Sequence, residues 1–510
     1  MVQHVLINRM SPEEQNRMRE GAHALMASAD PRTPTDPESW PRYAELYTHV
    51  IASGAVNSDQ PWVRQLVMNI AKYLYYWGDH DVSLDFSETA WNAWVEVFGE
   101  EDVQTLVMGR WLVFVYLMVG RYSDASTLVE HIRGVHERVS SPDNEEALNA
   151  FQMEAAVRRF QGRFLDGAEL DRVVYERAHR AFGDDDPASL NMAHNLGVSL
   201  RLTGAFREAL ELDRKTWNLK LRLFGRDDQR SLITENSIAI DVREAGDYVG
   251  ALRLQEAALE AFRDVFGNDN PATISTEREL GIACRKAGLH PRALELAIQS
   301  HEAFTRRYGD THPQSLATAL PLATALRQNG DLEAARARGS QACAGYRKVF
   351  HSLHPYALSA DVGLAVSERL LGKPEEARRL DDAALVALSD SLGADHPFTL
   401  VAAVNLASDM AALGEHEEAK SKGRDTLARC QQTFGPDHPT TLACAGNLSL
   451  DLMSLGLESE AAALRLDTEE RMRRVLDTQR VGEQEPTPHP ATVAFLNSTR
   501  LNCDIDPMPL

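Results

Sequence analysis

The stretch that decides the fold is Asp186–Phe224, DPASLNMAHNLGVSLRLTGAFREALELDRKTWNLKLRLF. Pro187 suits the first position of a helix, where its missing N–H is no loss. Apolar residues then recur at helical spacing until Gly204, at Leu190, Ala193, Leu196 and Leu200. A second amphipathic stretch, Phe206–Leu223, follows the glycine. The unit therefore predicts two helices joined by a tight turn.

The landmarks of this unit return every 42 residues along the chain. The turn glycine recurs ten times, at Gly78, Gly120, Gly162, Gly204, Gly246, Gly288, Gly330, Gly372, Gly414 and Gly456. Its last seven members are each followed by alanine five residues later, at Ala209, Ala251, Ala293, Ala335, Ala377, Ala419 and Ala461. A fixed period of this length over many units is the signature of a solenoid.

This pattern resembles the tetratricopeptide repeat (TPR), whose usual period is about 34 residues. The longer period and joints such as FGPDHPTTL at Phe434–Leu442 are similar to the kinesin-light-chain type of TPR. The resemblance implies an all-α, right-handed superhelix of about ten helix-turn-helix repeats. We expect the repeats over residues 61–480, with residues 61–144 divergent, and an N-terminal helical cap.

Composition limits the classes of function. The chain has 510 residues, of which 44% are hydrophobic, so a large core is expected. The net charge of −22 argues against a nucleic-acid or anionic membrane surface, because phosphate binding needs a basic field. No apolar run reaches the roughly 18 residues of a membrane span. Five scattered cysteines without C-x-x-C spacing indicate reduced thiols, so we expect a cytoplasmic protein.

Residues 1–60 do not follow the repeat register. A helix is expected to begin at Ser11–Glu14, within a helix pair over residues 1–29. The segments VQHVLINRM and WPRYAELYTHVIASGA resemble the junction between an NB-ARC-type STAND ATPase and its TPR array. That resemblance implies an upstream nucleotide-binding module, although the chain has no G-x-x-x-x-G-K-[S/T] loop. The alternative is a complete protein with an ordinary helical cap.

Residues 481–510 form a proline-bearing tail. Its ending, LNCDIDPMPL, resembles that of TPR proteins from the neighbourhoods of FxSxx-COOH modified peptides. The simpler interpretation is a tail that packs on the last repeat or stays mobile. The other is a docking motif in which Ile505, Met508 and Leu510 are apolar anchors between acids.

No catalytic signature is found in the sequence, and we expect neither enzymatic activity nor a cofactor. The column His312, His354, His396 and His438 suggests a metal site. However, each histidine precedes the proline of a helix start, and neighbouring helices lie about 8–10 Å apart, whereas zinc–nitrogen bonds are about 2 Å. We therefore expect no metal site.

One column of charges suggests a binding site. Arginine stands three residues before the turn glycine in six consecutive repeats, at Arg159, Arg201, Arg243, Arg285, Arg327 and Arg369. In TPR proteins this position lies towards the concave groove. The guanidinium groups could pair with acids of neighbouring repeats, or bind carboxylate or phosphate groups of a ligand. Both alternatives stay open.

Polar neighbours are expected to line the same groove, at Asn191, Asn195, Asn236, Asn405 and Asn447. The kinesin-light-chain resemblance implies that such asparagines grip the backbone amides of a peptide. Glu279, Pro321 and Gly363 replace the asparagine in the middle repeats, so two separate sub-sites are more readily expected than one continuous clamp.

The sequence thus predicts a scaffold that binds a protein or extended peptide, which bears acids or a free carboxylate. The leading hypothesis is the sensor or partner-recognition module of a STAND-type signalling protein. A regulatory scaffold for the maturation or export of a ribosomally made modified peptide is the second. A cryptic enzyme or nucleic-acid binder is the third, of a different class.

Overall fold

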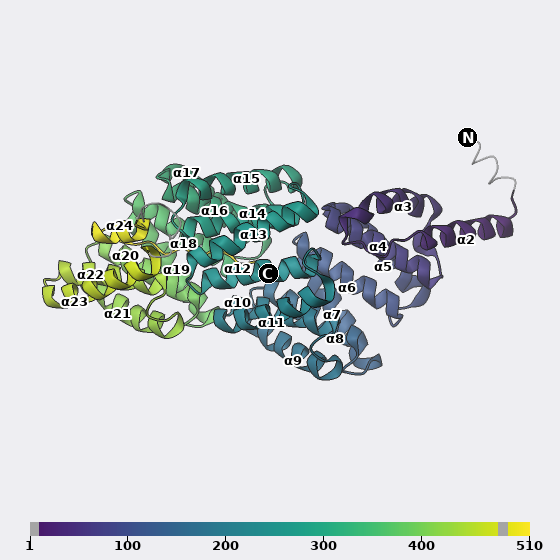
Figure 1. The fold of residues 1–510 in the computed structure, drawn as a ribbon, viewed down its shortest axis with the longest axis horizontal. Coiled ribbons are helices and arrows are strands. Elements are labelled where there is room, and N and C mark those ends of the chain that lie inside the picture. Colours follow the sequence, from purple (N-terminus) through teal and green to yellow (C-terminus); the bar gives the residue numbers. More distant parts are fainter. Residues whose placement is uncertain (1–9, 478–487) are drawn as a thin grey trace. The chain divides into compact units, whose positions relative to one another are not determined.

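The computed structural model describes residues 10–477 and 488–510, and in them all regular elements are helical (Figure 1). Contacts divide the chain into two compact units, Met1–Val157 and Arg158–Leu510. Each is described by itself. Across the described residues, no helix combines the length and apolar character needed to cross a membrane.

Ten helix pairs carry the repeat. The first helices are α4 (Pro61–Trp77), α6 (Val103–Met118), α8 (Glu145–Phe160), α10 (Pro187–Leu202), α12 (Gln229–Glu244), α14 (Pro271–Lys286), α16 (Pro313–Gln328), α18 (Pro355–Leu370), α20 (Pro397–Ala412) and α22 (Pro439–Ser454). The second helices are α5 (His80–Phe98), α7 (Tyr122–Val139), α9 (Phe164–Phe182), α11 (Phe206–Phe224), α13 (Tyr248–Phe266), α15 (His290–Tyr308), α17 (Leu332–Val349), α19 (Pro374–Leu392), α21 (His416–Thr433) and α23 (Glu458–Met472). Each first helix begins 42 residues after the one before. The predicted all-α repeat fold is confirmed.

In the described part of the first unit, the pairs are preceded by the helices α2 (Pro12–Ser28) and α3 (Trp40–Ser53), with short turns η1 (Pro37–Ser39) and η2 (Ala55–Asn57). Ser11 caps α2 in the expected way: its hydroxyl accepts from the Glu14 N–H, and Glu14 accepts from the Ser11 N–H. The part of the predicted N-terminal helix pair before residue 10 lies outside the described residues.

The backbone conformation at the ten turns explains why each of them has a glycine. All ten have φ between 71° and 97°, a left-handed conformation that residues with a Cβ rarely adopt. Each ends a first helix and lets the second helix fold back against it, as at Gly204 between α10 and α11. The recurrence of glycine in this column is thus explained by backbone geometry.

Histidines join successive turns of the superhelix in the second unit. The Nδ1 atom of His396 accepts from the Phe398 N–H at 3.1 Å, which caps α20, and its Nε2 donates to the Leu202 carbonyl at 2.9 Å. His438 makes the equivalent bonds, with its Nε2 on the Glu244 carbonyl at 3.2 Å. Partners 194 residues apart are therefore held together by neutral imidazoles. All four histidines of the column cap a helix, and His396 and His438 also join successive turns of the superhelix.

Gly204 lies where the start of α20 approaches the turn between α10 and α11. Replacing Gly204 tests this contact. A Cβ at Gly204 would approach the Pro397 ring to 2.5 Å, whereas a Cβ at Gly414, with nearly the same φ, meets nothing within 4 Å. Both Gly→Ala changes carry about 1–2 kcal/mol of left-handed strain. We expect Gly204→Ala to lower the free energy of unfolding by clearly more than Gly414→Ala, in urea denaturation. Equal losses would contradict the close approach of α20 to this turn.

The capping histidines predict acid sensitivity. Burial lowers the pKa of His396 and of His438 to about 4, against about 6.5 for an unfolded histidine. Because the folded pKa lies below the unfolded one, stability is complete above pH 6.5 and falls as the pH drops towards 4. Each histidine should cost about 2 kcal/mol between pH 7.5 and pH 5.

Thermal or urea unfolding of the wild type and of His396→Asn at the two pH values measures this. Asparagine still caps a helix but does not titrate. The variant should lose about 2 kcal/mol less than the wild type over the same pH change. An unchanged pH dependence would show that His396 is not held neutral by the fold.

Candidate functional site

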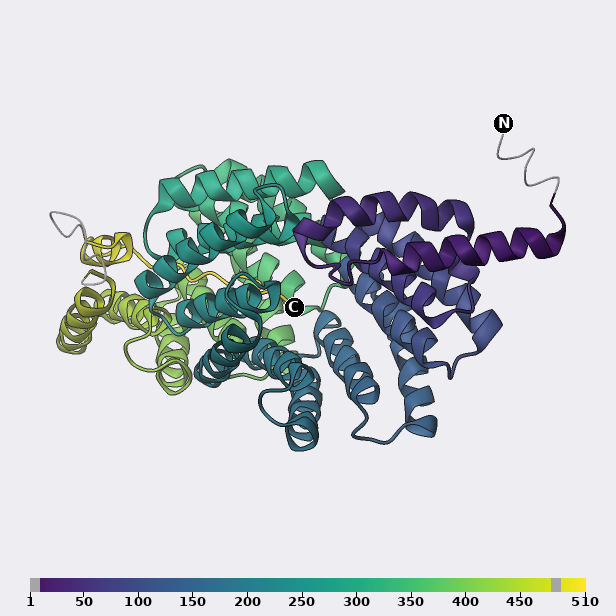
Figure 2. The ribbon, with the colours of Figure 1, turned by 45° about the vertical axis from the view of Figure 1, so that its right-hand side comes forward.

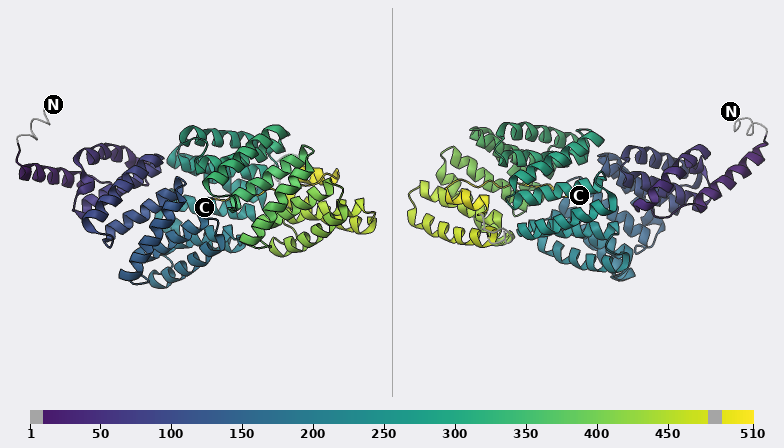
Figure 3. Two further views of the ribbon diagram at one scale, coloured as in Figure 1. Left: turned by 180° about the vertical axis from the view of Figure 1, so that it is seen from behind. Right: turned by 45° about the horizontal axis from the view of Figure 1, so that its top comes forward.

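The C-terminal residues run back along the first helices of the second unit. After η3 (Arg473–Asp477), α24 (Pro490–Leu496) packs on the last repeat, where Phe495 lies against Gly446. The remaining residues, 499–510, form no helix and are called the tail segment. Figure 2 shows it as a yellow thread that passes among the helices of this unit, and both views of Figure 3 place its end there.

The tail segment lies across several repeats, so the interpretation that it stays on the last repeat or remains mobile is wrong beyond α24. The physical reason is its content of buried groups. Leu501, Cys503, Ile505 and Met508 are all buried and belong to one core cluster with residues of α10, α18, α20 and α22. The surface that receives the segment is called the tail site. It is formed by first helices from α22 back to α14.

Two asparagines hold the backbone of the tail segment. Asn447 donates its Nδ2 to the Leu501 carbonyl and accepts the Leu501 N–H on Oδ1, both at 2.8 Å. Asn405 does the same with Cys503, at 2.8 Å to the carbonyl and 3.2 Å from the N–H. The asparagines are one repeat apart, and the residues they hold are two apart. Since alternate residues of an extended chain face the same side, this spacing fits a strand-like ligand.

A cationic sub-site receives the acids of the tail segment. Arg285 contacts both Asp504, at 3.2 Å, and Asp506, and Arg327 pairs with Asp504. Lys286 lies 3.2 Å from Asp506. Burial alone would raise the pKa of Asp506, but Arg285, Lys286 and Arg243 outweigh it and hold that pKa well below its usual range. The Asp506 carboxylate is therefore charged.

Three arginines of the column pair within the solenoid instead. Arg159 bonds Asp171, Arg201 contacts Asp213 at 2.8 Å and Asp241 at 2.6 Å, and Arg243 contacts Glu279 at 2.8 Å. These acids stand 12, 36 or 40 residues after their arginine, in the adjacent second helix or the next first helix. Arg369 is shared, because it pairs with Asp409 and also donates to the Asn502 side chain at 2.7 Å.

Arg285 and Arg327 lack such acids at the equivalent positions. The residues 12, 36 and 40 positions after Arg285 are Ala297, Pro321 and Ala325. The residues at the same spacings after Arg327 are Gly339, Gly363 and Ser367. The Gly363 carbonyl accepts from Arg327 at 3.1 Å. The carboxylates that pair with Arg285 and Arg327 are those of Asp504 and Asp506 in the tail segment.

Asp451 is the reverse case, an acid in the array without its expected arginine. Asp451 stands in the column of Asp241 and Asp409, but the arginine expected 40 residues before it is replaced by Ala411. The buried Asp451 instead pairs with Arg500 of the tail segment. The tail segment thus supplies a cation, Arg500, to the acid that has no arginine in the array. It also supplies two carboxylates, Asp504 and Asp506, to the arginines that have no acid there.

The remaining predicted asparagines have partners within the solenoid. Asn195 accepts from Arg159 at 3.2 Å and donates to the Asn191 carbonyl at 3.0 Å, and Asn236 accepts from Gln255. Sequence reasoning missed Tyr356, whose hydroxyl donates to the Met508 carbonyl, and Gln328, which donates to Asp504 at 3.2 Å. It also missed Asp451 and Lys286. The gap at Ala411 is the signal that could have revealed Asp451.

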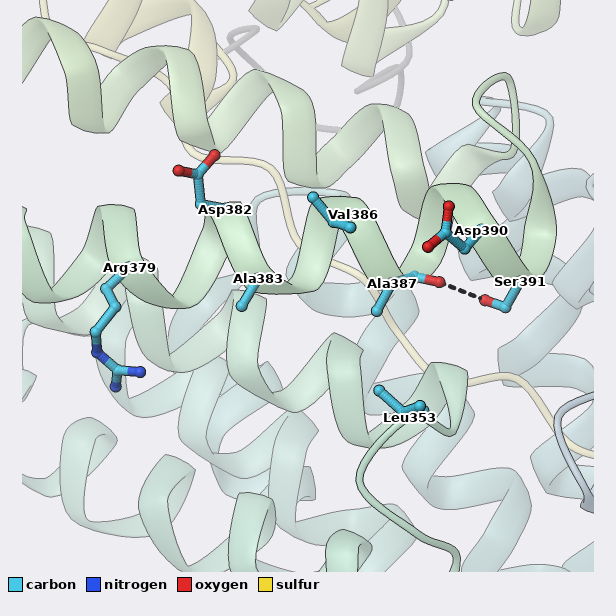
Figure 4. Close-up of a pocket in the computed structure, with 8 residues that line it drawn as sticks. All are labelled: Leu353, Arg379, Asp382, Ala383, Val386, Ala387, Asp390 and Ser391. Atoms are coloured by element: carbon cyan, nitrogen blue, oxygen red, sulfur yellow. Dashed lines mark hydrogen bonds between the residues drawn. The ribbon is translucent and has the colours of Figure 1, made fainter.

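A separate hollow lies over α19, with a volume of about 900 Å³ (Figure 4). It is lined by Leu353, Arg379, Asp382, Ala383, Val386, Ala387, Asp390 and Ser391. Leu353 and Val386 are more than 60% exposed, and Ser391 donates to the Ala387 carbonyl of its own helix at 2.8 Å. An open hollow with such a lining does not hold a nucleophile against a base.

The repeats can be compared with known families. One tetratricopeptide-repeat profile matches residues 230–300, 275–348, 356–429 and 402–473, and a second matches residues 189–230. Together they cover more than half of the sequence. The chain belongs to the tetratricopeptide-repeat family. No curated protein sequence matches it significantly.

Solved structures include similar solenoids. A putative kinesin light chain with nearly identical TPR-like repeats from Podosopora anserina is 26% identical, over 41% of this chain and 98% of that one, with a TM-score of 0.33. A Rap protein complexed with competence and sporulation factor is 13% identical, over 74% and 99%, with a TM-score of 0.50. The quorum sensor NprR from B. thuringiensis, in its apo form, is 14% identical, over 71% and 97%, with a TM-score of 0.47. The Rap likeness is one of fold.

The buried pairs of the column predict unequal roles for its arginines. Arg201→Gln leaves Asp213 and Asp241 buried without their cation, which should cost about 3–5 kcal/mol of unfolding free energy. Arg292→Gln breaks a half-exposed pair with Glu256 and should change it by at most about 0.5–1 kcal/mol. Urea denaturation of the two variants measures the difference. Similar small losses would show that Arg201 is not a structural ion-pair residue.

Proposed function

We propose that the second unit is a receptor for an extended peptide, or for an extended segment of a partner protein. The observation that carries this proposal is the double hydrogen bonding of Leu501 by Asn447 and of Cys503 by Asn405. An amide that meets both the N–H and the carbonyl of one residue recognises backbone rather than a particular side chain. Such recognition suits any chain that adopts the same extended conformation.

The cationic sub-site would add specificity to this backbone recognition. Arg285 and Arg327 lie along the same extended path, on the side that Asp504 and Asp506 face. Arginine suits carboxylates because its planar fork matches their geometry. The proposed ligand-contacting members of the arginine and asparagine columns are therefore Arg285, Arg327, Arg369, Asn405 and Asn447.

We further infer that this recognition serves as the sensor of a STAND-type signalling protein. That inference rests on the resemblance of segments within residues 1–60 to the junction of such proteins. The nucleotide-driven module that a bound ligand would control is not encoded in this sequence, which has no phosphate-binding loop.

Binding of a defined peptide tests the receptor. The probe is a fluorescent peptide of residues 499–510, and the protein is the full chain with Leu501→Pro and Cys503→Pro, which removes the two N–H groups that the asparagines accept. We expect the probe to bind this variant by fluorescence anisotropy. Methylation of the probe's Leu501 and Cys503 amide nitrogens should abolish binding, because it removes the same donors.

A probe methylated at the Asn502 nitrogen is the matched control, since that amide lies between the two held residues. It should retain binding. If the unmodified probe does not bind the proline variant, or if methylation at Leu501 and Cys503 leaves its affinity unchanged, the receptor proposal is wrong.

A further inference from the structure

We propose that the tail site takes in trans an extended acidic peptide with two carboxylates two residues apart, and that the tail segment is its tethered competitor. The inference rests on the receptor proposal and names the chemistry of the ligand. Its basis is the set of buried charges for which the helices supply no arginine, lysine or carboxylate partner, namely Arg285, Arg327 and Asp451. The occupant must complete them, whether it comes from this chain or from another.

The first argument is the cost of burying an unpaired charge. The side chains of Arg285 and Arg327 are 4% and 3% exposed, and the acids they contact are Asp504 and Asp506. In the repeats of Arg159, Arg201 and Arg243 an acid of the solenoid fills this role. A ligand without carboxylates would leave two guanidinium groups and the Lys286 ammonium buried against an uncharged chain, which is strongly unfavourable.

The second argument is register. Asn447 and Asn405 fix the backbone at residues 501 and 503, and the chain then enters the cationic sub-site at 504 and 506. Ile505 and Met508 are buried next to these acids. The site therefore selects acids at the first and third positions after the second held residue, with an apolar residue between them. Asp451 adds a preference for a cation just before the first held residue.

The third argument is that the occupant now present is covalently attached. The tail segment begins directly after α24, which is itself packed on the last repeat by Phe495. A short tether gives an effective concentration in the mM range, so a free peptide with the same contacts binds poorly while the tail segment is in place. A partner must then either match the acidic pattern at high local concentration or weaken the tail segment first.

The test uses the proline variant and the labelled 499–510 probe described above. A second probe carries Asp504→Asn and Asp506→Asn, so it keeps every backbone donor and acceptor. We expect this probe to bind at least about thirtyfold more weakly than the acidic one, as for loss of a buried charge pair. The wild-type chain should bind the acidic probe at least about tenfold more weakly than the proline variant does.

Chain-side variants provide a matched pair. In the proline background, Arg327→Gln should weaken the acidic probe but leave the amide probe nearly unchanged, whereas Arg292→Gln should affect neither. The comparison of the two probes needs no change in the protein beyond the proline background, so a failure of Arg327→Gln to fold does not affect it. If both probes bind equally, the acidic specificity is wrong while the receptor stands. Equal affinity of the acidic probe for the wild-type chain and the proline variant refutes the competition. If neither probe binds, the receptor itself is wrong.

Discussion

The second unit depends on one constraint: a charge that is buried between helices needs an opposite charge within reach. The 42-residue period places the arginines of successive first helices in one line, and packing removes them from water. Solvation can no longer stabilise them there, so each requires an acid. Where the neighbouring helices supply one, as Asp213 and Asp241 do for Arg201, the arginine fastens one repeat to the next.

Much of the fold could be predicted from the sequence because it is local and repeated. The turn glycines, the prolines at helix starts and the spacing of apolar residues each act within a few residues. The histidine column shows the limit of such reasoning. Its role in capping could be expected from the following proline, but the bond from His396 to Leu202 joins positions 194 residues apart and depends on how far the superhelix turns.

The candidate site was predicted only in part, because part of it depends on contacts between residues far apart in the sequence. The arginine and asparagine columns follow from the period alone. Which arginines remain for a ligand depends on the residues 12, 36 and 40 positions later, and these become relevant only when the stacking of helices is known. The tail segment shows no helical periodicity and no repeat. Its apolar anchors between acids, Ile505 and Met508 among them, suggested docking, but its place against α14–α22 is a long-range contact, and no local feature indicates which helices receive it.

The charge columns have two kinds of exception, an acid without its arginine and arginines without acids, and the tail segment corrects both. Asp451 has lost its arginine at Ala411, while Arg285 and Arg327 have no acids in the adjacent helices, and one extended segment corrects all three. Apolar burial of Leu501, Ile505 and Met508 is not directional and does not by itself fix the register of the segment, whereas the charge pairs do. The match of three charges along one backbone, fixed in register by two amide clamps, is the observation from which we propose peptide recognition. The second unit is therefore a solenoid whose own repeats are incomplete at one surface, and whose tail segment completes them.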